Sequence, residues 1–232
     1  MALFTIADLH LSEGTDKPMD VFGAAWANHK QRLEAAWRAL VKETDTVVVP
    51  GDISWGMRFD NTKSDLLFIN SLPGRKIIGK GNHDYWWNTL TKLNAFTADI
   101  GADTISFLFN NAYKVDGKVI CGTRGWFPDH AYGAEDEKIA LREAGRLRRS
   151  LEEGVKLAEN GEEIIAFLHY PPSFGGVKCP PVAEVLREFG VKRCFYGHLH
   201  GAPEQLLEKS VGVTDLYLIS ADKLGFTPLL IE

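Results

Sequence analysis

GKGNHDYWW, residues 79–87, places Asn82, His83 and Asp84 side by side between glycines and aromatic residues. The stretch follows a short apolar run, Lys76 to Ile78, that is typical of a buried strand. Packing does not require an amide, an imidazole and a carboxylate to crowd together at the end of a strand. Such a group either caps the next helix or handles a charged ligand, and the rest of the chain decides between these two interpretations.

The same arrangement recurs along the chain, because four other apolar runs also end in residues of the types that bind metal ions. These residues are Asp8 and His10, Asp52, His169, and His198 and His200, which join Asn82 and His83 of the opening stretch. Five of the seven histidines lie in these groups, whereas chance placement would scatter them. Strand ends converge on one crevice in open α/β sheets, so we expect these side chains to lie together. The remaining histidines, His29 and His130, are interpreted as structural.

Strands and helices alternate along most of the sequence, and the chain ends in strands. The residue patterns predict strands at 3–7, 46–50, 76–78, 106–109, 112–115, 118–121, 163–168, 193–196, 216–220 and 227–231. They predict helices at 29–42, 65–72, 87–96, 135–160 and 182–189. Asp116-Gly117 is a hairpin signal, while Gly145 and Gly154 weaken the expectation that the longest helix is continuous. The prediction is one α/β domain, 1–232, with two packed sheets and helices outside them.

Composition restricts the classes of function that fit the chain. Apolar residues make up 45% and charged residues 25% of the sequence, the balance of a soluble globular protein. The net charge of -5 gives no general nucleic-acid footprint, so nucleic acid is not the expected partner. No apolar run reaches the roughly 18 residues needed for a membrane span, and MALFTIADLHLS lacks the basic start of a signal peptide. Three widely spaced cysteines indicate reduced thiols, so we expect a cytoplasmic protein.

The spacing and chemistry of the strand-end residues favour a pair of metal ions. Residues two apart in an extended segment point to the same side, so Asp8 and His10 can face one ion, as can His198 and His200. Carboxylate, imidazole and amide groups without cysteine suit Mn²⁺, Fe or Zn²⁺, and we favour Mn²⁺. The set is too large for one tetrahedral ion and fits two ions that share a carboxylate. Such a pair would clamp a phosphoryl group and lower the pKa of a bridging water to give hydroxide.

The motifs DLH, GD, GNHD, a lone later histidine and GHLH occur in the order found in the calcineurin-like metallophosphoesterase superfamily, which the chain therefore resembles. Four other segments resemble a small bacterial group of predicted phosphohydrolases. They are residues 11–29, Trp86-Trp87, residues 123–126 and residues 170–172. The resemblance implies a four-layer α/β-β/α sandwich of two mixed sheets with flanking helices. It also implies a dinuclear site in which Asp52 bridges the metals and His83 faces the substrate. The other ligands would be Asp8, His10 and His200 for the first metal, and Asn82, His169 and His198 for the second.

Other residues near these motifs have two interpretations each. Asp84 either supports His83 or caps the following helix, and Arg124 is either a phosphate clamp or a solvated surface arginine. Trp55 stands where the protein Ser/Thr phosphatases have the aspartate that orients their catalytic histidine, which argues against that activity. The six tryptophans divide between two expected places: Trp26 and Trp37 are expected in the core, and about half of Trp55, Trp86, Trp87 and Trp126 are expected in the cleft.

The function we expect is hydrolysis of a small phosphate ester, a monoester or diester with nucleotide-like compounds among the candidates. The nucleophile would be the hydroxide between the metals, with His83 assisting the leaving group and Arg124 adding positive charge. Cyclic nucleotides and pyrophosphates also fit such a site, and the loops at 11–30 and 123–134 would select among them. The alternatives are a non-catalytic scaffold on the same fold and a nuclease acting on nucleic acid.

Overall fold

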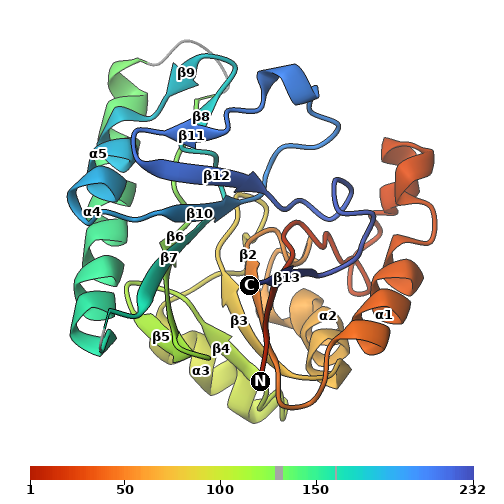
Figure 1. Cartoon of the computed structure of the whole chain (residues 1–232). Coiled ribbons are helices and arrows are strands. Elements are labelled where there is room, and N and C mark those ends of the chain that lie inside the picture. Colours follow the sequence, from red (N-terminus) through yellow and green to blue (C-terminus); the bar gives the residue numbers. More distant parts are fainter. Residues whose placement is uncertain (129–132, 160) are drawn as a thin grey trace.

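The computed structural model describes residues 1–128, 133–159 and 161–232, so His130 and the last residue of the predicted helix 135–160 lie outside the described residues. Two mixed sheets pack face to face with helices on both outer sides, which confirms the predicted fold class (Figure 1). None of the helices in these described ranges is both long and apolar enough to cross a membrane.

The first sheet contains the strands that lead into the N-terminal motifs. Its order is β13-β1-β2-β3-β4, with β1–β4 parallel and β13 antiparallel to β1. Because β1, β2 and β3 run in the same direction, the residues that follow them emerge at one edge of the sheet. The strands are β1 (Leu3–Thr5), β2 (Thr46–Pro50), β3 (Arg75–Gly79), β4 (Ile105–Phe107) and β13 (Leu229–Ile231).

The second sheet has the order β11-β12-β10-β7-β6-β5 and supplies the C-terminal motifs. Its strands β6, β7, β10 and β12 are parallel, while β5 and β11 are antiparallel edge strands. The strands are β5 (Ala112–Val115), β6 (Lys118–Thr123), β7 (Glu163–Leu168), β10 (Arg193–Tyr196), β11 (Ser210–Val211) and β12 (Thr214–Leu218). A separate hairpin, β8 (Ser173–Phe174) and β9 (Val177–Lys178), follows β7.

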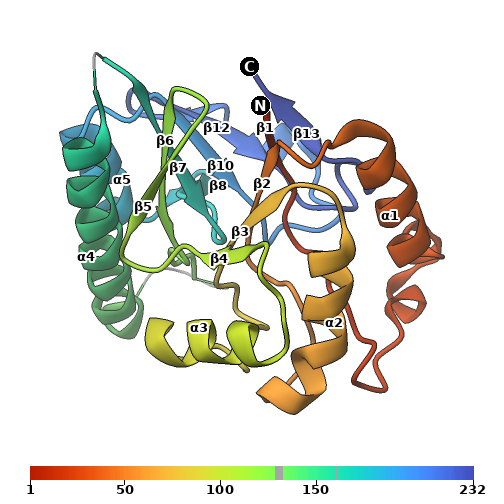
Figure 2. The same cartoon turned by 90° about the horizontal axis from the view of Figure 1, so that it is seen from below.

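Three hydrophobic clusters separate the four layers. Val48 of β2 and Phe167 of β7 lie in the cluster between the sheets, whereas Val47 and Val49 point to the outer cluster that contains Trp37. Both faces of β2 are buried, which explains its unbroken run of β-branched residues. Helices α1 (His29–Leu40), α2 (Phe59–Ser71) and α3 (Leu90–Asp99) cover the first sheet, and α4 (Ala134–Leu157) and α5 (Pro180–Glu188) cover the second (Figure 2).

The two sheets join beside the strand ends that carry the motifs. Ala7, just after β1, forms a parallel bridge with Ser220, just after β12. The backbone N–H of Ala7 donates to Ile219 at 2.8 Å, and the N–H of Ala221 donates back to Ala7 at 2.9 Å. This junction holds the segments after β1 and β12 next to each other, and the N–H of His198, after β10, donates to Asp8, so residues from both sheets can line one site.

Several helix boundaries differ from the prediction. Helix α2 begins at Phe59, six residues before the predicted start at Asp65, and Phe59 stacks on Phe96 of α3 with ring centroids 4.3 Å apart. Helix α3 begins at Leu90 and not at Trp87. Helix α4 continues through Gly145 and Gly154. A Cβ at position 154 would lie 2.3 Å from Cys121 Sγ, so only glycine permits the close approach of α4 to β6.

Candidate metal centre

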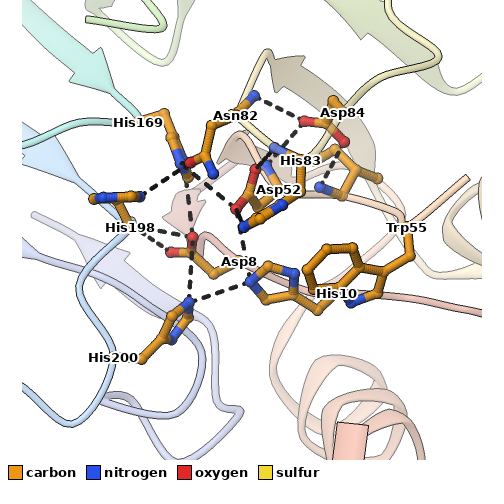
Figure 3. Close-up of polar contacts among 12 residues, drawn as sticks. Asp8, His10, Asp52, Trp55, Asn82, His83, Asp84, His169, His198 and His200 are labelled. Atoms are coloured by element: carbon orange, nitrogen blue, oxygen red, sulfur yellow. Dashed lines mark hydrogen bonds and ion pairs between the residues drawn. The ribbon is translucent and has the colours of Figure 1, made fainter. Parts of the chain in front are cut away.

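The predicted ligand residues come together at the shared edge of the two sheets (Figure 3). Each lies within a few residues of the carboxyl end of a strand, where the parallel directions of the strands predict convergence. The first sheet contributes Asp8 and His10 after β1, Asp52 after β2 and Asn82 after β3, and the second contributes His169 after β7 and His198 and His200 after β10. The sequence therefore predicted correctly that these side chains are neighbours.

One group of potential ligand atoms comes from Asp8, His10 and His200, whose side-chain donor atoms lie within 4.8 Å of one another. The Nε2 atoms of His10 and His200 are 3.2 Å apart, and His200 Nε2 is 3.9 Å from an oxygen of Asp8. Two imidazole nitrogens and a carboxylate oxygen facing one point form a suitable site for a divalent transition metal.

A second group consists of Asp8, Asp52 and His169, again with donor atoms within 4.8 Å of one another. The ring nitrogens of His169 lie 3.7 Å from Asp8 Oδ1 and 3.6 Å from Asp52 Oδ2. The same Asp52 oxygen is 3.7 Å from Nε2 of His10, so it lies between the two groups. A carboxylate in that position can contact ions on both sides.

Asn82 extends the second group with a neutral oxygen. Its Oδ1 lies 2.5 Å from Nε2 of His169 and 3.0 Å from Nδ1 of His198. The three atoms therefore converge on one small volume from β3, β7 and β10, two of which belong to the second sheet.

Burial perturbs the titration of these groups in the absence of a cation. It raises the pKa of Asp8 to about 6, and together with the charges of Asp84 and Asp8 it raises the pKa of Asp52 well above the usual range. Burial also lowers the pKa of His10 and His169, each of which has a buried Nδ1 without a hydrogen-bond partner in the described part of the chain. Imidazoles with a lowered pKa next to carboxylates with a raised pKa fit a metal site, because a bound cation would favour the deprotonated form of both groups.

The backbone at this site is strained. Asp8, His10, Asp52 and His198 have φ values of 60°, 47°, 51° and 71°, in the left-handed region that non-glycine residues rarely adopt. Such strain collects at functional sites, where the surrounding structure compensates for it.

Close approach of the loops adds a second constraint. A Cβ at Gly81 would lie 2.0 Å from Asp52 Oδ1, and a Cβ at Gly197 would lie 2.3 Å from Asp8 Oδ2. Only glycine permits the loops after β3 and β10 to pass this close to the two carboxylates.

Asp84 has a different role from either predicted one. Helix α3 is capped by Thr89, whose side chain accepts from the N–H of Lys92, so the cap interpretation of Asp84 is wrong. The carboxylate is fully buried, and its hydrogen-bond partners are backbone and indole N–H groups and not the ring of His83. These donors are the backbone N–H groups of Asp52 and Gly81 to Oδ2, and those of Ile53 and Ser54 with the indole of Trp86 to Oδ1. Asp84 therefore ties the loop after β2 to the loop after β3.

His83 lies at the mouth of the centre, with its ring centroid 4.3 Å from that of Trp55. Burial and the nearby charges of Lys17 and His200 lower its pKa to about 4, so the ring is neutral near pH 7. Its backbone N–H donates to Asp52 Oδ1 at 2.8 Å, which fixes the loop beside the ligand groups. Lys17, which the sequence analysis did not identify, lies with its Nζ 3.7 Å from the centroid of Trp55.

A cavity of about 540 Å³ opens beside His83 on the side of His10 and His200. Its apolar wall comes from the loop between β1 and α1 and from the loop after β2. The residues of this wall are Met19, Phe22, Ala25, Trp26 and Trp55. Trp26 was expected in the core but also lines this cavity, whereas Trp86 and Trp87 pack in the core under the first sheet and do not line the cavity.

The profile of the calcineurin-like phosphoesterase family matches residues 1–202 of the chain, the part that contains all of the strand-end residues described above. The chain belongs to the calcineurin-like phosphoesterase family. Solved structures with the same fold include a protein of unknown function from Aquifex aeolicus, at 15% identity and a TM-score of 0.54 over 99% of this chain and 95% of that one. Phosphopantetheinyl hydrolase from Mycobacterium tuberculosis is similar at 12% identity and a TM-score of 0.57, over 99% and 95% of the two chains. No curated protein sequence matches the chain.

One polar residue of the centre lies beyond the part matched by the calcineurin-like phosphoesterase profile. Asp222 Oδ1 is 2.9 Å from Nδ1 of His200, and its Oδ2 accepts from the N–H of Gly201 at 3.1 Å. Burial opposes protonation of His200, but the hydrogen bond to Asp222 and the charge of Asp8 outweigh it and raise the pKa of that ring. A carboxylate behind a histidine fixes the ring so that its other nitrogen faces the metal position. No motif marked Asp222, because its role depends on the junction between the sheets.

Arg124 is not a solvated surface residue in this calcineurin-like phosphoesterase. Its side chain is 17% exposed, and its guanidinium lies 3.5 Å from the buried carboxylate of Glu143. Its carbonyl oxygen accepts from the backbone N–H groups of His169 and Tyr170 at 3.0 and 2.9 Å. The residue therefore borders the candidate metal centre on the side of His169.

Proposed function

We propose that the chain is a metal-dependent phosphoesterase that hydrolyses a small phosphomonoester or phosphodiester with two bound divalent ions. The observation that supports this most strongly is the convergence of two carboxylates, four imidazoles and an amide oxygen from both sheets on one edge. When bound, the ions would supply an activated water and neutralise charge on the phosphoryl group. Mn²⁺, Fe and Zn²⁺ all accept this ligand set, and we favour Mn²⁺.

The ligand assignment follows the two groups of converging atoms. Asp8, His10 and His200 would hold one ion, and Asn82, His169 and His198 would hold the other. Asp52 would contact both, which agrees with its oxygen lying 3.7 Å from His10 Nε2 and 3.6 Å from His169 Nε2. Asp8 approaches His169 nearly as closely as Asp52 does, at 3.7 Å against 3.6 Å, so its carboxylate would also lie beside the second ion.

His83 is proposed to touch the phosphoryl group as a neutral hydrogen-bond donor. Its pKa of about 4 leaves it uncharged near pH 7, and two nearby cations would lower that pKa further. A neutral ring keeps one N–H to donate, and such a donor stabilises charge that develops on a phosphoryl oxygen. The low pKa therefore favours electrostatic stabilisation over proton donation to the leaving group.

The apolar wall of the cavity supports a substrate with a flat or apolar group next to the phosphoryl group. Trp55 stacks on His10 with centroids 5.1 Å apart, and Trp26 lies 5.6 Å from His10 and 5.4 Å from His200. An aromatic ring or a nucleobase bound against these indoles would place its ester oxygen beside His83. A nucleotide-like ester satisfies this requirement.

Turnover and metal content, measured on matched variants, test the proposal. The chain would be supplied with Mn²⁺ and assayed on bis(p-nitrophenyl) phosphate and p-nitrophenyl phosphate. We expect Asp52→Asn to lose metal and activity, and His83→Ala to keep its metal while kcat falls by about 10²–10³-fold. Asp45→Asn is the control, because this buried carboxylate lies at the other end of β2, where it accepts from the backbone N–H groups of Ala2 and Lys42. Undiminished turnover by metal-stripped protein would refute the mechanism, and metal binding without turnover of any ester would indicate a scaffold.

A further inference from the structure

Three guanidinium groups surround one buried carboxylate beside the metal centre. Glu143 Oε1 lies 2.6 Å from Arg146, 3.5 Å from Arg124 and 3.8 Å from Arg142. The other oxygen of Glu143 accepts from the hydroxyl of Thr123 at 2.9 Å, so the carboxylate is fully engaged. We call Arg124, Arg142 and Arg146, together with Lys80, the arginine cluster.

The sequence assembles this cluster from three places. Arg142 and Arg146 are four residues apart on α4 and therefore share a face of the helix. Helix α4 packs against β6, and the contact between Glu143 and Thr123, the last residue of β6, places this face at the edge that carries the metal centre. Arg124 follows Thr123 directly, and Lys80 comes from the loop after β3 and interacts electrostatically with Arg124 and Arg146.

Positive charge in the cluster exceeds the negative charge that faces it. Within the described ranges, four cationic side chains gather around Glu143, and the other carboxylate near Lys80 is Asp84. Asp84 is already occupied by five N–H donors. The whole chain carries a net charge of -5, so this local excess does not follow from a basic composition.

The cluster has an open side. The side chain of Arg142 is 56% exposed and that of Arg146 is 28% exposed, while Glu143 has no exposed surface behind them. Aromatic rings support two of the guanidinium groups: Arg146 lies 5.7 Å from the centroid of Phe109, and Arg124 lies 5.5 Å from that of Trp126. Arg124 also retains a buried Nε without a hydrogen-bond partner among the described residues. Planar donors held in place beside an opening to solvent, which Arg142 and Arg146 provide here, are the features that recognise tetrahedral oxyanions.

We propose that the arginine cluster is a second anion-binding site, which takes a phosphate group without help from the metal centre. The cluster adjoins the side of the centre formed by Asn82 and His169, because Lys80 is two residues from Asn82 and the carbonyl of Arg124 binds the N–H of His169. In the proposed phosphoesterase it would hold an additional phosphate of the substrate, while the apolar cavity holds the opposite end. This last assignment rests on the proposed function, whereas phosphate binding itself does not.

Calorimetric titration of inorganic phosphate into the full chain, stripped of metals with a chelator, tests the anion site directly. We expect saturable binding that weakens by about tenfold or more in Arg142→Gln/Arg146→Gln, because each lost guanidinium removes charge-assisted hydrogen bonds. Arg148→Gln is the control, since Arg148 lies on the same helix but pairs with Glu188. If the double variant does not fold, Arg142→Gln alone replaces it, because that side chain is mostly exposed. Absence of saturable binding, or equal binding by the cluster variant and wild type, overturns the proposal.

A pair of nucleotide esters tests the assignment to the substrate. Thymidine 5′-(p-nitrophenyl phosphate) and its 3′-phosphorylated derivative differ only in the additional phosphate. We expect a higher kcat/KM for the derivative with wild-type protein, and loss of that advantage in Arg142→Gln/Arg146→Gln with turnover of the simple ester retained. If wild type hydrolyses neither of these esters, the substrate assignment fails; if it also leaves bis(p-nitrophenyl) phosphate and p-nitrophenyl phosphate intact, the proposed function fails, while the phosphate titration still decides the anion site. Equal kcat/KM for the two esters refutes the substrate assignment alone.

Discussion

Replacing Asp84 by asparagine tests whether this carboxylate holds the loops of the proposed metal centre together. In the wild-type protein both oxygens of Asp84 accept hydrogen bonds. Oδ2 accepts from two backbone N–H groups, and Oδ1 accepts from two backbone N–H groups and the indole N–H of Trp86. Asparagine has nearly the same shape but offers only one acceptor oxygen. In its better orientation the new amide nitrogen faces the N–H groups of Asp52 and Gly81, which then have no acceptor.

The size of the effect follows from these two donors. A buried N–H left without an acceptor costs about 1–3 kcal/mol, so Asp84→Asn should lower the free energy of unfolding by about 2–6 kcal/mol. That is a large part of the roughly 5–15 kcal/mol available to a protein domain. The loop that carries Asp52 also loses its anchor, and metal affinity should fall by about 10–100-fold, as for other residues that support metal ligands.

Urea unfolding of the metal-stripped chain measures the first effect, and calorimetric titration with Mn²⁺ measures the second. Asp45→Asn is the matched control, because Asp45 is also buried and accepts two backbone N–H groups, those of Ala2 and Lys42, at 2.8 and 2.9 Å. The control should lose stability and keep its Mn²⁺ affinity. The reasoning is refuted if Asp84→Asn unfolds within about 1 kcal/mol of wild type, or if it binds Mn²⁺ as wild type does.

Three further predictions concern helix packing, titration and metal binding. Gly154→Ala should destabilise the chain by about 1–3 kcal/mol, because the new Cβ would meet Cys121 Sγ. Gly145→Ala should stabilise α4 by about 1 kcal/mol, because a Cβ there meets nothing within 4 Å. Equal shifts of the two melting temperatures in thermal unfolding would contradict both expectations. Burial raises the pKa of Asp65 from 3.8 to about 6, because the buried site disfavours the charged carboxylate. The protonated side chain therefore adds to the free energy of unfolding below pH 4. This contribution is lost as the pH rises through 6. The unfolding free energy of wild type should fall by about 3 kcal/mol relative to Asp65→Asn over that range, and parallel pH profiles would exclude the effect. Free Mn²⁺ at about 100 times its Kd should add about 2.7 kcal/mol to the stability of wild type and little to Asp52→Asn, which thermal unfolding with and without chelator measures.

Much of the architecture could be predicted from the sequence because the determining signals are local. The run TVVVP is apolar on both faces, and the structure buries both faces of β2 between two clusters. Asp116 and Gly117 both have positive φ in the β5–β6 turn, as the hairpin signal indicates. The meeting of Asp8 with His200, 192 residues later, also follows from a local rule, since parallel strands deliver their carboxyl ends to one edge. The binding of metal by these residues stays a prediction.

Helix boundaries were less predictable because tertiary contacts set them. The first turn of α2 is polar apart from Phe59, so its sequence gives little sign of a helix. Phe59 stacks on Phe96 of α3, a helix that is distant in sequence, and this contact favours the earlier start of α2. The reason for glycine at position 154 within α4 likewise lies in β6, since the thiol of Cys121 occupies the space that a side chain would need.

Residues that position another side chain or loop, and would not themselves bind a metal, were the least predictable part of the site. Asp222 acts on His200, and Asp84 acts on the backbone of two loops, so neither forms a motif with its own neighbours. Trp26 contacts His10 and His200 across the cavity only because the loop between β1 and α1 folds back over the strand ends. Sequence proximity carries no information about such contacts.

The left-handed backbone at four of the proposed ligands sets a trade-off between stability and activity. Each such residue costs roughly 1–2 kcal/mol compared with glycine, which adopts this conformation freely. Glycine at position 8, 10, 52 or 198 would therefore relieve strain in the metal-free chain while it removes a ligand. A directed-evolution screen scored on heat resistance alone would favour glycine at these positions and enrich variants that have lost a proposed metal ligand. Selection for a more robust form of this protein must score metal content and melting temperature together.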